Sequence, residues 1–394
     1  MKIGILEIMP QGHYTLVDSI ARIYASDSQN EIFICTHEKL AEVLKPLLNE
    51  NIGDIKLVVK NKNESLVLFF EKVNQLNLNL LFIATLEKYF KPFYNFNFNC
   101  ALSFFIHDID SWFLLKLKYK IYNILNDFSF SPRIIYKLKV SFIYTKWRAR
   151  IVDKILYSGG RFVVLNKNLK NELSKYVSEE RIDVIPFSVF NKNLKDNSIN
   201  NNCLRICIPG WVSQLRRDYF SVLKMFEEDI DFYRGKVELD LLGCVVKIEQ
   251  GREIIKQAER LNANGIKVNY YDIPFIPVDE FDAQLSKADI ILGNMNVVLN
   301  KYSKYGKTKD TGIIFTMIRA AKPGILPIDY ALIDELKSSS VIYEDYLKLR
   351  IIIKNLVENK IMIDSLKKEA QKNSLLFDPC YIYKNLPKAR ELDS

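Results

Sequence analysis

Short apolar runs alternate along the chain with segments in which apolar residues recur every three to four positions. Before residue 190, the apolar runs are KIGILEI, EIFICT, IKLVVK, LNLLFIA, CALSFFIHD, RFVVLN and RIDVIPF. The segments between them, such as 14–26 and 39–48, have the periodicity of amphipathic helices. Continuous apolar strands separated by helices are typical of a parallel sheet that helices cover on both faces.

A polar, asparagine-rich stretch, FNKNLKDNSINNNC at 190–203, interrupts this alternation, which then restarts. The later apolar runs are LRICIPGW, VELDLLGC, IKVNYYD, DIILGNM and PGILP, and a helical tail is expected over 346–375. The pattern predicts two doubly wound, Rossmann-like α/β domains facing a central cleft, with ligands outside the carboxyl ends of the strands. The expected boundaries are domain 1–190, linker 191–203, domain 204–375, and a tail, 376–394, that packs back on the body.

Composition agrees with a two-domain globular protein. The chain has 394 residues, which is long for one core, and it is 48% hydrophobic and 26% charged. We see no uncharged apolar run long enough for a transmembrane helix, and the N-terminus resembles a first strand more than a signal peptide.

The six cysteines include no CxxC pair, and the chain has only three histidines. This usage argues against a structural zinc site and favours reduced thiols in the cytoplasm. We therefore expect no metal and no bound cofactor.

The net charge of +9 is concentrated in one segment, 112–157, which has ten Lys or Arg against two Asp. Large aromatic residues interleave with these charges. The mixture suits an anionic membrane surface. An ordinary helix pair with solvated lysines explains it equally well, and nucleic-acid binding is a weaker alternative that we do not expect.

Two loops of the second half have the chemistry of phosphate binding. In CIPGWVSQLRRDY, Gly210 makes a turn after a strand, and Arg216 and Arg217 precede a helix. Backbone N–H groups at a helix start and guanidinium groups can both donate hydrogen bonds to phosphate oxygens. The alternative is a pair of surface arginines with Asp218 as their partner.

In YGKTKDTGIIFT, Lys309, Thr311 and Gly312 precede an apolar helix, an arrangement that suits a diphosphate or a ribose. It is not a P-loop, because the GxxxxGK[ST] spacing is absent. The alternative is a helix cap beside a basic loop. Asn294, just past the DIILGNM strand, is a candidate sugar contact.

Polar residues also follow two strands of the first half. His107 and Asp108 come just after SFFI, where an imidazole can act in acid–base chemistry or orient an acceptor. The alternative for His107 is a structural histidine that caps the next helix. Gly12 and His13 form the corner after the first strand, where we expect Gly12 to allow close approach and His13 to contact a substrate.

The order of these motifs resembles that of GT-B glycosyltransferases, in particular the retaining enzymes that use nucleotide-activated sugars. The resemblance spans nearly the whole chain. It implies that the sugar nucleotide lies on the C-terminal domain and the acceptor on the N-terminal domain. It further implies that Arg216 or Arg217 contacts the diphosphate, that His107 lies near the transferred sugar, and that Gly12 approaches the donor.

One departure concerns the paired glutamates that many retaining members carry before the Gly-Lys-Pro-like turn. Thr308 and Thr316 occupy those places here, and neither can act as a carboxylate. Asp310 is the nearest carboxylate and is the candidate substitute, with Thr316 kept as a donor contact. The resemblance makes a retaining outcome the expectation.

We therefore expect a glycosyltransferase that moves a sugar from a nucleotide-sugar donor to a glycan or lipid-linked acceptor in bacterial surface polysaccharide or glycoconjugate synthesis. It would act in the cytoplasm, peripherally at the inner membrane face through 112–157. The alternatives are a nucleotide-sugar epimerase of the same fold and a membrane-associated scaffold that has lost catalysis.

Overall fold

The structure is a computed structural model that describes residues 1–9, 13–48, 55–113, 134–194 and 203–386. It divides into two compact units, which are described separately. Unit 1 comprises Met1–Phe187, Lys307–Asp310 and Pro379–Ser394. Unit 2 comprises Ser188–Gly306 and Thr311–Asp378.

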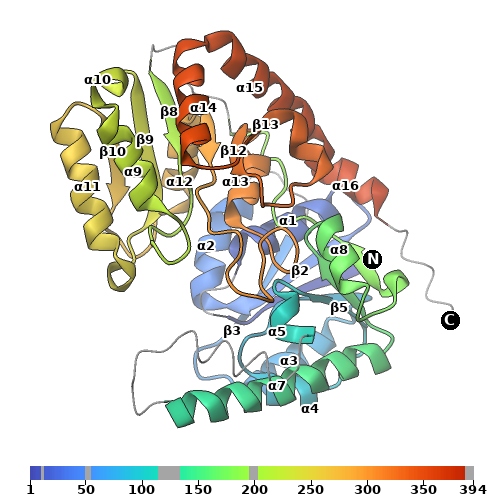
Figure 1. The fold of residues 1–394 in the computed structure, drawn as a ribbon. Coiled ribbons are helices and arrows are strands. Elements are labelled where there is room, and N and C mark those ends of the chain that lie inside the picture. Colours follow the sequence, from blue (N-terminus) through green and yellow to red (C-terminus); the bar gives the residue numbers. More distant parts are fainter. Residues whose placement is uncertain (10–12, 49–54, 114–133, 195–202, 387–394) are drawn as a thin grey trace. The chain divides into compact units, whose positions relative to one another are not determined.

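Unit 1 is built on a seven-stranded parallel sheet with the strand order β3-β2-β1-β4-β5-β6-β7 (Figure 1). The strands are β1 (Lys2–Glu7), β2 (Glu31–His37), β3 (Ile55–Lys60), β4 (Leu80–Thr85), β5 (Ala101–Phe105), β6 (Arg161–Val164) and β7 (Ile182–Val184). The chain reverses its direction of travel across the sheet between β1 and β4. Ligands of doubly wound sheets bind beyond the carboxyl ends of the strands at such a switch point.

The helices of unit 1 are α1 (Tyr14–Ala25), α2 (Glu38–Leu48), α3 (Leu66–Gln75), α4 (Phe90–Asn95), α5 (Ile109–Phe113), α7 (Ile134–Tyr157), α8 (Lys167–Leu173) and α16 (Pro379–Asn385). Among them, α1, α2 and α8 pack on this sheet, while α7 packs against α4 and α5. In α1, for example, Leu16, Val17 and Ile20 are fully buried. The C-terminal helix α16 packs against α1, and Tyr383 donates a hydrogen bond to Asp27 over 2.9 Å.

Unit 2 repeats this plan with six parallel strands in the order β10-β9-β8-β11-β12-β13. The strands are β8 (Leu204–Cys207), β9 (Val237–Cys244), β10 (Lys267–Tyr271), β11 (Ile290–Leu292), β12 (Gly324–Pro327) and β13 (Ser340–Tyr343). Its switch point lies between β8 and β11. The helices are α9 (Tyr219–Glu228), α10 (Ile230–Tyr233), α11 (Gly251–Ala263), α12 (Val278–Lys287), α13 (Gly312–Ala320), α14 (Tyr346–Glu358) and α15 (Lys360–Ser374).

These two parallel-sheet units confirm the predicted fold class. The tail that was expected to be helical over 346–375 consists of two helices, α14 and α15. They separate at Asn359, whose side-chain oxygen accepts the backbone N–H of Met362 over 3.1 Å and so caps the start of α15. The predicted linker falls largely on 195–202, outside the described residues.

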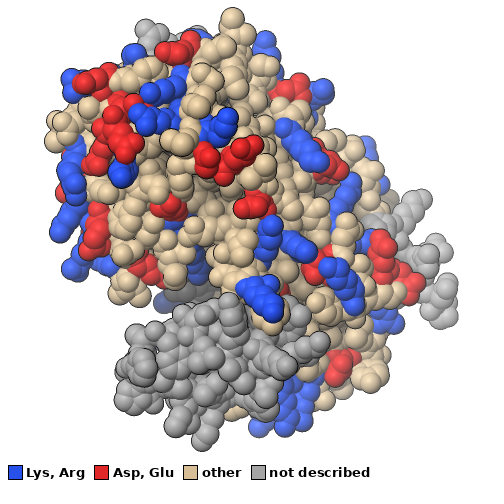
Figure 2. Space-filling view, in the orientation of Figure 1, with Lys and Arg blue, Asp and Glu red and all other residues tan. Residues whose placement is uncertain are grey.

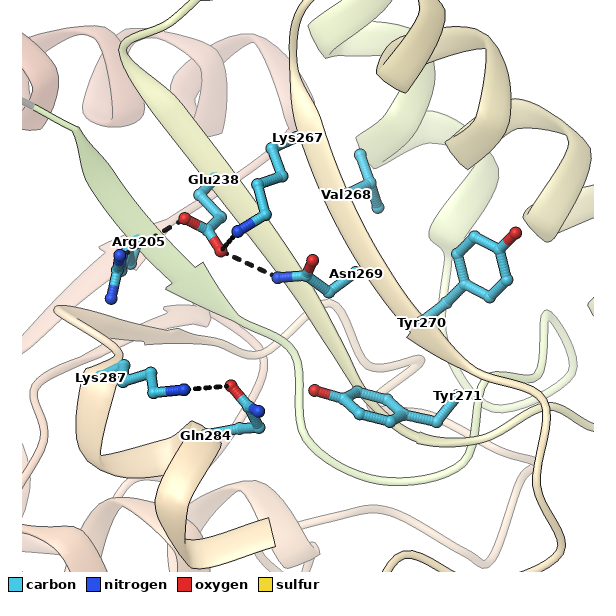
Figure 3. Close-up of a pocket in the computed structure, with 9 residues that line it drawn as sticks. All are labelled: Arg205, Glu238, Lys267, Val268, Asn269, Tyr270, Tyr271, Gln284 and Lys287. Atoms are coloured by element: carbon cyan, nitrogen blue, oxygen red, sulfur yellow. Dashed lines mark hydrogen bonds and ion pairs between the residues drawn. The ribbon is translucent and has the colours of Figure 1, made fainter. Parts of the chain in front are cut away.

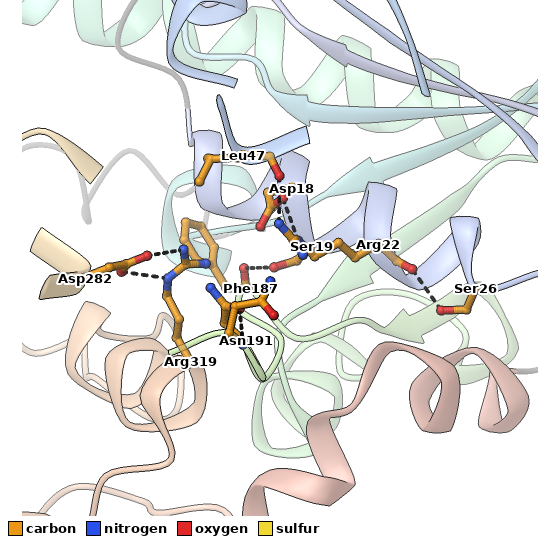
Figure 4. A network of polar contacts seen from close by, with 10 residues as sticks. Asp18, Ser19, Arg22, Ser26, Leu47, Phe187, Asn191, Asp282 and Arg319 are labelled. Atoms are coloured by element: carbon orange, nitrogen blue, oxygen red, sulfur yellow. Dashed lines mark hydrogen bonds and ion pairs between the residues drawn. The ribbon is translucent and has the colours of Figure 1, made fainter. Parts of the chain in front are cut away.

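Arginine contacts tie helices together within each unit (Figure 4). In unit 1, Arg22 of α1 donates to Asp18 over 2.8 Å and to the carbonyl of Leu47 in α2 over 2.9 Å. In unit 2, Arg319 of α13 makes a two-pronged contact with Asp282 of α12, over 3.1 and 2.6 Å. Bidentate pairs of this kind fix helix register as well as adding stability.

No disulfide is found among the cysteines that the structure describes, and burial raises the pKa of the Cys35 thiol to about 12. Within the described ranges, no helix has the length and apolar content needed to cross a bilayer.

Candidate functional site

The carboxyl edge of the unit 1 sheet brings two histidines together. His13 ends the loop after β1, and His107 follows β5; their ring centroids are 4.5 Å apart. Phe187 lies against both rings, at 5.3 Å from His13 and 6.0 Å from His107. Ser19 of α1 donates to the carbonyl oxygen of Phe187 over 3.0 Å, which holds this aromatic wall in place (Figure 4).

Both imidazoles are neutral at physiological pH. Burial lowers the pKa of His13 to about 3, and the nearby His107 adds to this effect. Burial also lowers the pKa of His107. His107 Nε2 lies 2.7 Å from the carbonyl oxygen of Ala84. Because a carbonyl can only accept, Nε2 carries the proton, and Nδ1 is left as an acceptor.

His107 does not cap the helix that follows it, which was the structural alternative for this residue. Asp108 takes that place, because its carboxylate accepts the N–H of Ser111 over 3.3 Å and the Ser111 hydroxyl over 3.0 Å. The imidazole instead packs with His13 at the switch-point edge. This placement favours the functional interpretation of His107.

Glu7 is a residue of this edge that the sequence analysis did not select. It is the last residue of β1, it is fully buried, and its Oε1 accepts the N–H of Met9 over 2.8 Å. Burial raises the pKa of this carboxyl to about 7. Thr85 and the backbone groups of Met9 and His13 favour the ionised form of this carboxyl and act to lower its pKa, but burial has the larger effect. The available signal was one carboxylate at the end of an otherwise apolar strand.

The segment Lys307–Asp310 also belongs to unit 1. Lys309 Nζ lies 3.5 Å from Asp108 Oδ2, and the two residues form an antiparallel bridge. Asp310 accepts a hydrogen bond from Asn166, the cap of α8. Thr308 donates to Asp110 over 3.1 Å. Lys309 and Asp310 are therefore assigned to a different compact unit from Thr311 and Gly312, although they adjoin them in sequence.

In unit 2, Gly210 and Arg217 meet beyond the end of β8. Gly210 has φ of +97°, and a Cβ atom there would lie 2.6 Å from Arg217 Nη2. Only glycine therefore combines this backbone conformation with room for the guanidinium group. Arg217 is only 8% exposed, and its Nη1 is buried without a hydrogen-bond partner.

The two arginines of the motif have different environments. Arg216 lies over the ring of Trp211, 5.1 Å from its centroid, and Trp211 is 52% exposed. The predicted alternative partner, Asp218, caps α9 instead, accepting the N–H of Ser221 over 3.1 Å and the Gln214 amide over 2.9 Å. Within the described part of the chain, Arg217 therefore has no carboxylate counter-ion.

Asn294 lies beside this arginine loop. The N–H of Asp218 donates to the carbonyl oxygen of Asn294 over 2.9 Å, and Arg217 forms a bridge with Met295. Asn294 is 1% exposed, and neither its side-chain oxygen nor its nitrogen has a partner among the described residues. A buried amide without partners is costly. Its position, just past β11, is the second side of the unit 2 switch point.

The start of α13 has an open N-terminus. Thr311 caps it, with its hydroxyl accepting the N–H of Ile313 over 3.4 Å. A Cβ atom on Gly312 would meet no atom within 4 Å, so the space over this residue is open. The hydroxyl of Thr316 donates to the carbonyl oxygen of Gly312 over 2.7 Å. This geometry is compatible with an anion site, which stays a prediction. Gly12 lies outside the described residues.

A hollow of unit 2 is lined by residues of β8, β9, β10 and α12 (Figure 3). Its charges are largely paired, since Glu238 accepts from Lys267 over 2.8 Å and from Asn269 over 2.9 Å. Arg205, Glu238 and Lys267 stand at the amino-terminal starts of their strands. The hollow therefore runs along β10 at the edge of the sheet, rather than beside the switch point between β8 and β11, where this fold binds ligands.

Of the basic segment, residues 112–113 and α7 lie among the described residues. Arg148 lies over the rings of Phe90 and Trp112, and Arg150 lies over those of Tyr94 and Trp147. Lys154 donates to the carbonyl oxygen of Tyr94 over 2.7 Å. These cations therefore help to hold α7 against α4 and α5, while Lys146 is exposed.

Basic and acidic side chains are interspersed among the described residues on the face shown in Figure 2. No cluster of three or more His, Cys, Asp or Glu able to hold a metal ion is found in the part of the chain that the structure describes. The expectation of a metal-free site stays a prediction.

Two Rossmann-like units, each with polar residues at its switch point, are the hallmark of the GT-B fold, and comparison with solved structures supports this class. No protein-family model and no curated protein matches the chain by sequence. By structure, the chain is similar to Anabaena HepE in complex with UDP and glucose, with a TM-score of 0.63 at 16% identity, over 98% of this chain and 97% of that one.

Two further solved structures share the fold. One is WaaG, a glycosyltransferase involved in lipopolysaccharide biosynthesis, with a TM-score of 0.55 at 12% identity, over 98% of both chains. The other is a putative UDP-N-acetylglucosamine 2-epimerase from Listeria monocytogenes, with a TM-score of 0.50 at 13% identity, over 97% of this chain and 93% of that one. At these identities the likeness establishes the GT-B fold.

Proposed function

We propose that the chain is a glycosyltransferase that moves a sugar from a nucleotide-sugar donor to a glycan or lipid-linked acceptor. The observation that carries this proposal is Arg217, a buried arginine with an unpartnered Nη1 beside Gly210 at the unit 2 switch point. A buried cation without a counter-ion is costly unless a ligand supplies the negative charge. The diphosphate of a sugar nucleotide would do so.

In this proposal, unit 2 binds the donor. Arg217 and the N-terminus of α13 at Thr311 and Gly312 receive the diphosphate, and their positive charge stabilises the nucleoside diphosphate as it leaves. Asn294 supplies hydrogen bonds to the sugar or ribose, which would satisfy its buried amide. Arg216 on Trp211 is a peripheral contact. The UDP bound to HepE, a protein of the same fold, supports this choice of ligand class.

Unit 1 would contact the acceptor and the transferred sugar through His13 and His107. Because both rings are neutral, His107 Nδ1 can accept a hydrogen bond from a sugar hydroxyl. Asp108 and Lys309 form one ion pair at this edge, and Asp310 is engaged with Asn166. We also propose that the transfer retains the anomeric configuration of the sugar. Thr308 and Thr316 stand where many retaining enzymes have glutamates, so no carboxylate acts from these two places.

We further propose that the enzyme serves surface polysaccharide or glycoconjugate synthesis at the inner membrane face, with 112–157 as its contact with anionic lipid. The support for this proposal is that the chain shares its fold with WaaG, a glycosyltransferase involved in lipopolysaccharide biosynthesis. The exposed Lys146 and half-exposed Trp147 of α7 offer the mixture of charge and aromatic area that interfaces favour.

Donor turnover distinguishes transfer from the epimerase alternative. The purified chain is incubated with a panel of sugar nucleotides, with and without a membrane extract as acceptor. The proposal predicts nucleoside diphosphate release that depends on the extract and falls at least about tenfold in Arg217→Met, since one charge-assisted contact is worth about 1.4 kcal/mol or more. Lys224→Met, an exposed change on α9, should behave as wild type.

Conversion of a sugar nucleotide to its epimer without any acceptor would favour the epimerase instead. No turnover of any sugar nucleotide, under either condition, would favour the catalytically inactive scaffold.

A further inference from the structure

Tyr343 is a buried residue of unit 2 whose hydroxyl reaches the strand end that carries Asn294. It is the last residue of β13, it is 5% exposed, and it donates to the carbonyl oxygen of Gly293 over 3.0 Å. Gly293 directly follows β11, and β12 lies between β11 and β13 in the sheet. The hydroxyl therefore crosses a whole strand to reach the backbone group next to Asn294, the proposed donor contact.

The reason for this long reach is Pro327, the last residue of β12. Where β11 and β12 pair in parallel, the N–H of Gly293 donates to the carbonyl oxygen of Ile325 over 2.8 Å. In such a ladder the next bond returns from the N–H two residues further along β12 to the carbonyl oxygen of Gly293. That residue is Pro327, which has no N–H to donate. The carbonyl group of Gly293 thus lacks its partner in the sheet.

Tyr343 supplies the hydrogen bond that Pro327 cannot. The two residues are partners in the register between β12 and β13, so they lie side by side. A proline inside a sheet removes one bond of the ladder, and a buried carbonyl group left without a donor is costly. Here the phenolic hydroxyl takes the place of the missing N–H.

The next carbonyl group along the chain is held as well. The backbone oxygen of Asn294 accepts the N–H of Asp218 over 2.9 Å. Two consecutive carbonyl groups, those of Gly293 and Asn294, are therefore fixed from opposite directions, one by Tyr343 and one by the arginine loop. The Asn294 side chain has no partner among the described residues, so its direction depends on this backbone.

We propose that Tyr343 is a positioning residue for donor binding: its hydroxyl replaces the sheet hydrogen bond that Pro327 removes, and so fixes the backbone that aims the Asn294 amide. The consequence for the donor rests on the proposed function, whereas the replacement of the hydrogen bond does not. An amide holds a hydroxyl of the sugar or ribose only while its distance and direction are maintained. Loss of the Tyr343 hydroxyl should therefore weaken donor binding.

One NMR signal reports on this hydrogen bond. Gly293 and Asn294 form the one Gly-Asn pair of the sequence. Full-length protein with ¹³C in glycine carbonyl groups and ¹⁵N in asparagine therefore gives a single carbonyl-to-amide signal in an HNCO spectrum. Without ligand, this signal should shift in Tyr343→Phe. It should return toward its wild-type position when Pro327→Ala is added, because alanine restores an N–H.

Tyr271→Phe is the matched control for this measurement. Tyr271 is also the last residue of a strand in unit 2, but its strand, β10, is at the edge of the sheet, away from β11. Removal of its hydroxyl should leave the HNCO signal in place.

Donor binding separates positioning from a merely structural role. The probe for calorimetry is UDP-glucose, which carries the nucleotide of the HepE complex. Tyr343→Phe should raise Kd about fivefold, the equivalent of one neutral hydrogen bond, and added Pro327→Ala should recover most of this loss. In an Asn294→Ala background, Tyr343→Phe should cause no further loss, because both changes remove the same contact. Tyr271→Phe should bind as wild type.

An HNCO signal that does not move in Tyr343→Phe would overturn the proposal. Equal affinity of wild type and Tyr343→Phe for UDP-glucose, or independent losses from Tyr343→Phe and Asn294→Ala, would do the same. A shifted signal that Pro327→Ala does not restore would contradict the replacement of the sheet bond.

The double variant keeps the test decisive if Tyr343→Phe does not fold by itself. A folded double variant with the wild-type signal would then support the replacement, and an unfolded one would contradict it. A signal that shifts and is restored, in a protein that binds no sugar nucleotide, would support the hydrogen-bond replacement and count against the proposed function.

Discussion

Arg217 and Glu7 are polar residues that are buried beside the switch points of the two sheets. Glu7 ends β1, and Arg217 lies in the loop between β8 and α9. Each is beside the switch point of its unit and has a polar atom without a partner among the described residues. Arg217 is matched to Gly210, where any Cβ would meet the guanidinium group. Glu7 Oε1 accepts the backbone N–H of Met9 over 2.8 Å. Both positions cost stability in the absence of ligand, which is common at functional sites.

Glu7 should make stability depend on pH. Its folded-state pKa of about 7 lies above the ordinary value of 4.5, so the folded state holds the proton more tightly. The free energy of unfolding should therefore fall as pH rises from about 4.5 to about 7, by up to about 3 kcal/mol, at about 1.4 kcal/mol per pH unit. Urea denaturation at pH 4.5 and pH 7.5 measures this difference.

Glu7→Gln should remove this part of the pH dependence, because glutamine does not ionise. The free energy of unfolding of the variant should therefore increase relative to that of wild type as pH rises. Glu87→Gln, a change of the same type at an exposed position, should keep the wild-type profile. Identical profiles for wild type and Glu7→Gln would contradict the burial argument.

At the scale of elements, some basic residues of α7 pack within unit 1, and others are available for the proposed contact with lipid. Arg148, Arg150 and Lys154 are engaged with the aromatic rings and carbonyl groups of unit 1, so the structural alternative accounts for these three. The membrane proposal therefore depends on the remaining cations of 112–157. Among them, Lys116, Lys118 and Lys120 lie outside the described residues.

Changing Lys116, Lys118 and Lys120 to Glu should weaken binding to anionic vesicles at least about tenfold, since each basic residue near such a surface contributes about 1 kcal/mol. Co-sedimentation measures this, and added salt should weaken wild-type binding as well. The matched control changes the exposed Lys337, Lys360 and Lys372 of unit 2 to Glu. Equal loss in both triple variants would mean that net charge alone, rather than 112–157, governs binding.

The elements themselves were largely predictable from the sequence, because continuous apolar runs and helical periodicity are local signals. These signals placed His107 and Asn294 just past the ends of strands and Arg217 just before a helix. The pairing of Lys309 with Asp108 did not, since the two are far apart in the chain and only the fold brings them together. Glu7 was missed for another reason: a single carboxylate in an apolar strand gains meaning only when its burial is known.

At the scale of the molecule, the same plan occurs twice. Each unit has a parallel sheet with one switch point, and polar residues from non-consecutive strands gather there: His13 and His107 in unit 1, Arg217 and Asn294 in unit 2. This arrangement and the likeness to HepE define the GT-B fold. The proposed function depends most on Arg217 binding the diphosphate of a donor.

Thermal unfolding with nucleoside diphosphates and sugar nucleotides tests that claim most directly. At a ligand concentration of about 100 times Kd, the correct nucleotide should stabilise wild type by about 2.7 kcal/mol. Arg217→Met and Gly210→Ala, which displaces the same guanidinium, should lose most of this gain, and Lys224→Met should keep it. Stabilisation of Arg217→Met equal to that of wild type, or no stabilisation of wild type by any nucleotide of the panel, would contradict the account.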